Sequence, residues 1–174
     1  FSPQSLLRVA AGKTINRPEF RELAPFSFYD YKRNAIMTGN PNLTFATINN
    51  YDLRWELYPA AGEMFSVGAF YKQFVNPIEL YFQPGVGSGG TLSFIPGNAK
   101  GATNYGVEIK KKKKLNSISN VSFIQNLTLV ANASFIKSVI KLSDSNTETG
   151  VDTDRPMMGQ SPYIINTGIY YQND

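Results

Sequence analysis

The chain has 174 residues, a net charge of +4, and neither cysteine nor histidine. This length favours a single domain. The missing residue types exclude disulfide frameworks, Cys/His zinc sites, thiol nucleophiles and histidine-based catalytic triads. No uninterrupted apolar run reaches the roughly 18 residues that a membrane-spanning helix needs, although transmembrane β-strands are shorter and only half apolar.

Five of the 17 basic residues form one run, residues 110–114. The other charges nearly balance, so we expect no broad nucleic-acid surface and no nucleic-acid partner. A lysine run at the end of a strand is typical of a solvated rim. The alternatives for this lysine run are a nucleic-acid or nuclear-import patch and a contact with anionic lipid head groups.

Alternation of apolar and polar side chains predicts about six long strands. The first covers residues 6–14. The second covers residues 49–58, where Tyr51, Leu53 and Trp55 alternate with charged residues, and it turns tightly at residues 59–62. The remaining strands are expected over the following ranges: 64–74, 102–112, 127–140 and 163–172.

Long and short connections alternate between these strands. The long ones are residues 15–47, residues 76–101 with a possible small hairpin of 80–82 and 92–95, and the acidic residues 144–155. Long loops at one end and short turns at the other are typical of outer-membrane barrels. We therefore predict an all-β, antiparallel meander. A soluble antiparallel β domain that binds carbohydrate or protein through aromatic loops stays the alternative.

The longest loop joins several aromatic side chains to cations. Flat rings stack on sugars or catecholate-type ligands, and cations attract anionic chelates. These rings also have a plainer explanation, in which they pack the loop against its neighbours or rim the membrane. The predicted ligand-binding residues are Phe26, Phe28, Tyr29, Tyr31 and Arg33.

Catalysis finds little support in the sequence. Without histidine or cysteine, acid–base chemistry would need a carboxylate pair such as Glu56 and Glu108, and nothing places these two within reaction distance. Carboxylates on a polar barrel lumen more often pair with lumen cations. We expect no enzymatic activity, no catalytic residues, no cofactor and no metal site.

Several short motifs resemble, in the same order, those of TonB-dependent outer-membrane receptors. They are the residues 17–26 (RPEFRELAPF), 39–43 (GNPNL), 50–56 (NYDLRWE), 62–63, 70–72 with 76–79 (NPIE), 106–108, and 155–156 with 159–163. The resemblance implies that residues 1–174 form an arc of a 22-stranded transmembrane β-barrel in the bacterial outer membrane. It also implies that the plug domain and other barrel strands are absent from this chain.

The resemblance further implies a function for the parent receptor: energy-coupled uptake of a scarce nutrient, of the iron-chelate, cobalamin or oligosaccharide class. The implied partners are the nutrient ligand, the receptor's own plug domain and remaining barrel strands, outer-membrane lipid, and the inner-membrane TonB complex. The last of these would be reached through an N-terminal part outside this chain. The residues expected to face the plug across the lumen are Asp52, Arg54, Glu56 and Glu108.

Overall fold

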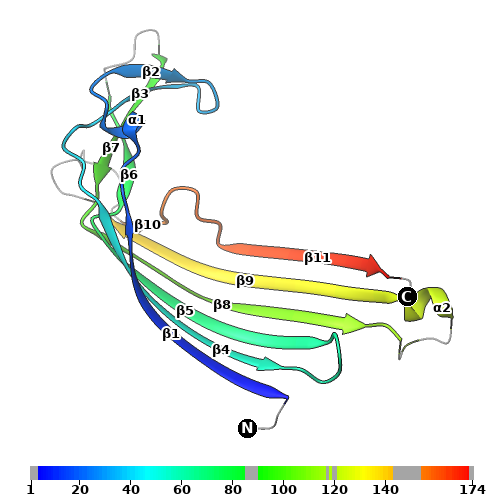
Figure 1. Ribbon diagram of the computed structural model, residues 1–174. Coiled ribbons are helices and arrows are strands. Elements are labelled where there is room, and N and C mark those ends of the chain that lie inside the picture. Colours follow the sequence, from blue (N-terminus) through cyan, green and yellow to red (C-terminus); the bar gives the residue numbers. More distant parts are fainter. Residues whose placement is uncertain (1–3, 85–89, 117, 119–120, 143–153, 173–174) are drawn as a thin grey trace.

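The computed structural model describes residues 4–84, 90–116, 118, 121–142 and 154–172. A long, curved seven-stranded sheet, here called the wall, carries a smaller four-stranded sheet at one end (Figure 1). Neighbouring wall strands run antiparallel in sequence order, and β1 and β11 form the two long edges among the described residues. The wall strands are β1 (Ser5–Asn16), β4 (Ala46–Leu57), β5 (Met64–Val75), β8 (Gly101–Lys114), β9 (Leu127–Lys141), β10 (Asp154–Arg155) and β11 (Tyr163–Tyr171).

The outer face of the wall is apolar and is edged by aromatic rings. Tyr51, Tyr71 and Tyr105 lie directly opposite one another on three adjacent strands, and the first two rings are 6.4 Å apart. Toward the short turns, Trp55 packs edge-on against Phe65 at 6.0 Å. Aliphatic side chains lie between these aromatic positions and are exposed, which is the arrangement expected where a sheet faces lipid.

The inner face of the wall is polar. The cross-strand register places Asp52, Glu56 and Glu108 on this face, together with Arg54 and Lys72. All the carboxylates of the six long wall strands lie on the inner face, whereas the outer face of these strands carries none. The predicted all-β antiparallel meander, with a lipid row and a lumen row, is therefore confirmed.

The lysine run differs from the prediction because strand β8 continues through all five lysines to Lys114. The predicted end of this strand, at residue 112, was too early. The strand period divides the run between the two faces, with Lys111 and Lys113 on the outer face. The Lys113 Nζ atom lies 2.9 Å from a carboxylate oxygen of Glu63 at the tight turn, so one outward lysine is neutralised where the wall leaves the apolar band.

The small sheet is built from two connections that lie far apart in the sequence. Residues 15–47 contain α1 (Phe20–Leu23), β2 (Ser27–Asp30) and β3 (Ala35–Thr38), although no periodic pattern marked them. The predicted hairpin is present as β6 (Ile78–Phe82) paired with β7 (Leu92–Asn98). The strand order is β2-β3-β7-β6, and β3 pairs in parallel with β7.

A small apolar core lies where the small sheet meets the wall. It consists of buried side chains from β6, the start of β8 and the end of β9, including Tyr81, Ala102 and Ile140. The only other helix among the described residues is α2 (Ser122–Gln125), and no described helix is long and apolar enough to cross a membrane. Most of the predicted acidic loop of residues 144–155, namely residues 144–153, lies outside the described residues.

Two adjacent positions on β9 test the assignment of the faces. Ala133 lies on the outer face opposite Ile109, whereas Ser134 lies on the inner face opposite Glu108. In the complete receptor, we expect Ala133→Arg to destabilise the barrel by about 2–4 kcal/mol, because it places a cation in lipid. Ser134→Arg should cost less than about 1 kcal/mol beside that carboxylate. Denaturant titration in lipid vesicles, followed by heat-modifiable gel mobility, measures both. Equal losses would contradict the assignment.

Candidate functional site

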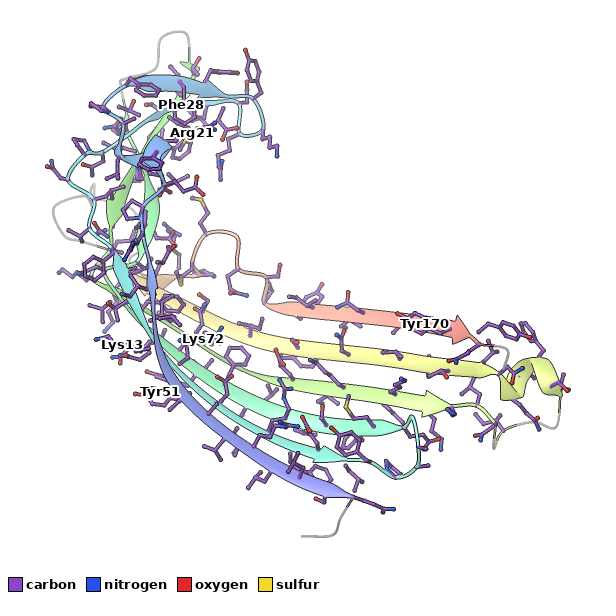
Figure 2. The ribbon with its side chains drawn as sticks, in the orientation of Figure 1. Lys13, Arg21, Phe28, Tyr51, Lys72 and Tyr170 are labelled. Atoms are coloured by element: carbon purple, nitrogen blue, oxygen red, sulfur yellow. The ribbon has the colours of Figure 1, made fainter. Side chains whose placement is uncertain are left out.

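An open cavity of about 430 Å³ lies between α1, the small sheet and the segment before β11. We call it the outer cavity, because it lies at the long-loop end of the wall. Phe28 on β2 faces it, and the Arg21 guanidinium lies over the Phe28 ring at 5.0 Å from the ring centre. Figure 2 shows these two side chains next to each other within the small sheet, well away from Tyr51 and Lys72 on the wall.

Charges around the outer cavity are largely paired with each other. Arg33 lies 2.6 Å from the Asp30 carboxylate, and that carboxylate also accepts the Lys32 N–H at 2.9 Å. The hydrogen bond from Arg33 holds the pKa of Asp30 below its ordinary value. Glu22 accepts the N–H of Glu19 at 2.9 Å, which closes a capping box on the short helix α1. The Arg21 cation has no such carboxylate among the described residues.

Close backbone approach at Gly39 shapes one side of the cavity. A Cβ atom at this position would lie 2.0 Å from the Ala24 carbonyl oxygen, so only glycine fits. The next residue, Asn40, donates its N–H to the Glu22 carbonyl at 2.6 Å and its side-chain amide to the Pro96 carbonyl at 3.1 Å. The Gly39–Asn40 pair therefore joins α1 to the small sheet.

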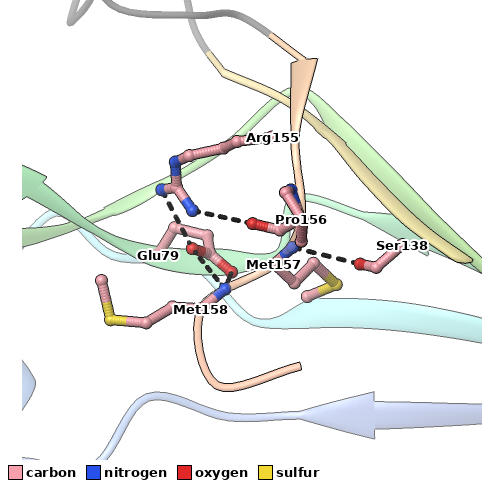
Figure 3. A network of polar contacts seen from close by, with 6 residues as sticks. All are labelled: Glu79, Ser138, Arg155, Pro156, Met157 and Met158. Carbon is pink, nitrogen blue, oxygen red and sulfur yellow. Dashed lines mark hydrogen bonds and ion pairs between the residues drawn. The ribbon is translucent and has the colours of Figure 1, made fainter. Parts of the chain in front are cut away.

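Glu79 joins the small sheet to the segment before β11 (Figure 3). Its carboxylate is buried and lies 3.2 Å from the Arg155 guanidinium, and it accepts the Met158 N–H with both oxygens at 3.3 Å. On the wall side, the Met157 N–H donates to the Ser138 hydroxyl at 3.1 Å. These contacts bring Met158 to the rim of the outer cavity.

A second, smaller cavity of about 270 Å³ lies on the inner face of the wall. We call it the lumen cavity. Three of the residues predicted to face the plug, Asp52, Arg54 and Glu108, line it. Arg54 and Glu108 flank Gly68 on the intervening strand, and a Cβ atom at Gly68 would lie 3.8 Å from the Arg54 side chain. Other side chains that line it include Lys72, Asn104 and Gln160.

Glu56, the fourth predicted lumen residue, does not line that cavity and instead centres a polar cluster nearer the tight turn. Arg8 lies 3.2 Å from one of its oxygens and Arg54 lies 3.8 Å from the other. The Tyr58 hydroxyl, just beyond β4, donates to Glu56 at 2.7 Å. This hydrogen bond raises the pKa of Tyr58 above its ordinary value.

The predicted ligand-binding residues separate into two groups. Phe28 and Arg33 line the outer cavity, whereas Phe26, Tyr29 and Tyr31 do not. The rings of Tyr29 and Tyr31 pack edge-on at 5.0 Å, and Tyr31 is 88% exposed. Strand alternation places Tyr29 on the face of β2 opposite to Phe28. Whether either group contacts a ligand stays a prediction.

Sequence reasoning did not assign a role to Arg21, Glu79 or Arg155, although each falls inside a quoted motif. Glu79 and Arg155 contact each other but lie 76 positions apart in the sequence, so the spacing of their motifs alone does not connect them. Within the described residues, no cluster of His, Cys, Asp or Glu side chains is arranged to hold a metal ion.

Curvature, an apolar outer face edged by aromatic rings and a polar inner face define a transmembrane β-barrel wall. The whole chain, residues 1–174, matches the family described as TonB dependent receptor-like, β-barrel. The chain therefore belongs to the TonB-dependent receptor family, whose barrels lie in the bacterial outer membrane, and the soluble alternative is set aside. No curated protein sequence matches the chain.

Solved structures with a similar fold include two receptors of Pseudomonas aeruginosa. The siderophore receptor PirA is 15% identical with a TM-score of 0.60, and the match covers 83% of this chain and 29% of PirA. A mutant of the ferric enterobactin receptor PfeA in complex with enterobactin is 18% identical with a TM-score of 0.59, covering 99% of this chain and 24% of PfeA. This chain thus spans less than a third of either receptor's length.

Gly39 offers a test of how the outer cavity is built. We expect Gly39→Ala in the complete receptor to displace α1 from the small sheet, because the added methyl group would overlap the Ala24 carbonyl. Hydrogen exchange should then rise at the Asn40 amide while the wall strands stay protected. Gly12→Ala is the matched control, since nothing lies within 4 Å of its Cβ position. Unchanged hydrogen exchange in Gly39→Ala would contradict the close backbone contact between Gly39 and Ala24.

Proposed function

We propose that this chain is part of a receptor that binds a nutrient at its long-loop end and imports it across the outer membrane. The observation that carries the proposal is the outer cavity, which lies at the loop end of a barrel wall and presents Phe28 together with Arg21 and Arg33. An aromatic ring beside guanidinium groups suits a flat, anionic chelate. Family membership supports uptake by binding and gating rather than bond chemistry.

Among the nutrient classes, we propose an iron chelate. Support comes from the similar structures, which include a siderophore receptor and a ferric enterobactin receptor. Two carboxylates that line the outer cavity, Asp30 and Glu79, are each ion-paired with an arginine, which reduces their repulsion of an anionic ligand. Cobalamin and oligosaccharide stay as the other candidates.

Growth on defined iron sources tests the proposed class. We would delete the gene of the complete receptor and supply iron only as ferric enterobactin, as other ferric siderophores in turn, or as free iron salt. Loss of growth on one chelate, with normal growth on the salt, supports the proposal. Normal growth on every chelate would overturn it in favour of another nutrient.

Phe28 and Tyr31 separate the two possible ligand-contact surfaces. We expect Phe28→Ala to weaken binding of the chelate identified by the growth test by about 1–3 kcal/mol, the usual cost of losing an aromatic anchor. Tyr31→Ala should have a smaller effect, because its ring lies outside the outer cavity. Titration of the purified receptor measures both affinities. If Tyr31→Ala weakened binding more than Phe28→Ala, we would assign the ligand contact to the open face of β2 instead of the outer cavity.

We also propose that the inner face of the wall contacts the receptor's own plug, with the energy supplied through the TonB complex. Asp52, Arg54, Glu56 and Glu108 all lie on this face and offer charges of both signs to a plug surface. Such groups need partners once a protein surface excludes water from them. The remaining barrel strands would pair with the exposed edges of β1 and β11.

Arg54→Ala tests this contact. Arg54 lines the lumen cavity and approaches Glu56 at 3.8 Å, so its removal should loosen the seating of the plug without altering the outer cavity. We expect higher ion conductance through the receptor in planar bilayers, with chelate affinity unchanged. Lys111→Ala, on the outer face, serves as the control and should leave conductance at the wild-type level. A loss of affinity in Arg54→Ala would contradict the assignment.

A further inference from the structure

The short segment of residues 155–160, before β11, lies between the two cavities. Met158 and Gly159 line the outer cavity, whereas the next residue, Gln160, lines the lumen cavity. In Figure 1 this segment rises from the wall on the side toward which the small sheet leans. Consecutive residues of one segment thus form the boundary between a cavity at the loop end and a cavity on the inner face.

Polar contacts hold this segment against the wall on one side. The Met157 N–H donates to the Ser138 hydroxyl, which itself donates to the Asn104 side chain at 2.6 Å. The Asn104 amide then approaches the Gln160 side-chain oxygen at 3.4 Å. Each of these contacts is a neutral hydrogen bond of modest net strength. The segment is also joined to the wall at its first residue, because Arg155 in β10 pairs with Ile140 on β9. Beyond that pairing, the wall holds residues 156–160 through these neutral contacts and the packing of Met157 against the small apolar core.

The charged contact comes from the small sheet, through Glu79. Its side chain is 3% exposed, and a carboxylate so deeply buried is costly unless it is paired. Both its ion pair to Arg155 and its hydrogen bonds from the Met158 N–H go to this one segment. Removing the carboxylate would therefore release the segment at two points and leave Arg155 without its partner.

The geometry points to a role for Glu79 as a positioning residue: it holds residues 155–160 in place as a partition between the outer cavity and the lumen cavity. Gly159 gives this segment its turn, because its φ of +77° is a backbone conformation that favours glycine. The inference deepens the proposed function and rests on it, since the segment lies between the cavity proposed to bind the ligand and a cavity on the inner face of the wall.

Cysteine labelling tests the partition without any ligand, so its outcome is separate from that of the uptake test. This chain contains no cysteine, so an introduced thiol is unique within it. The complete receptor, with any cysteine elsewhere changed to serine, would carry Asp52→Cys in the lumen cavity or Thr38→Cys in the outer cavity. A membrane-impermeant maleimide added to intact cells reports how quickly each thiol is reached from outside.

We expect Glu79→Ala to raise the labelling rate of Asp52→Cys by about tenfold or more, the change expected for losing a charged contact. The rate for Thr38→Cys should stay within about twofold. Glu79→Gln keeps an oxygen that can accept the Met158 N–H, so it should give a smaller rise. Heat-modifiable gel mobility confirms that each variant is folded.

Glu63→Ala is the matched control. Glu63 is also buried and ion-paired, at 2.9 Å from Lys113, but it lies at the tight turn and touches neither cavity wall described above. It should leave both labelling rates unchanged. The inference is overturned if Glu63→Ala acts like Glu79→Ala, if both thiols accelerate together, or if Asp52→Cys is equally accessible, or equally inaccessible, in every variant.

Discussion

The structure depends on one constraint, namely that lipid offers no hydrogen bonds to a peptide backbone. Every wall strand therefore has to be paired along its length, and the observed ladders are long and regular from β1 to β11. The same constraint decides which side chains occupy each face. A carboxylate in lipid would be costly, and the six long strands place Asp52, Glu56 and Glu108 all on the inner face.

The small sheet is held together by different interactions, because it has almost no apolar core of its own. Few of its large side chains are fully buried, and its position is set by polar side chains that reach between distant connections. Asn98 accepts the Thr44 N–H at 2.9 Å and donates to the Asn76 carbonyl at 2.8 Å, while Asn40 reaches Pro96. These side chains are only partly buried, and each bonds groups from a distant connection, so together they fix how the connections lie against one another.

This difference between the wall and the small sheet explains which parts of the fold could be predicted from the sequence. The wall was predictable because a period of two is local, and a strand such as β5 shows it within a dozen residues. Of the small sheet, only the hairpin of β6 with β7 was predicted, because the parallel pairing of β3 with β7 joins segments more than fifty positions apart. Short strands that alternate weakly leave no periodic signal in the sequence. Without the position of β2, the aromatic residues of residues 15–47 could not be assigned to one face.

The candidate site was likewise only partly predictable from the sequence. Asp52, Arg54 and Glu108 were expected to face the lumen because of the family resemblance, and the structure brings them to one cavity. Glu79 was visible only as part of a motif, because its partner Arg155 lies 76 positions away and no local rule connects them. The motifs at residues 39–43, 76–79 and 155–156 share a structural role, since each supplies a contact between segments that are distant in the sequence.

The two ways of holding the structure together fit the proposal that a ligand binds at the loop end of the wall. The wall is held by continuous backbone ladders, which open only with large loss of structure, so it is suited to remain fixed in the membrane. The loop-end layer is held by a few separable polar contacts, each of which can break while the others persist. A rigid barrel with a layer of this kind at its outer end can rearrange around a ligand without disturbing the strands that seal it against lipid.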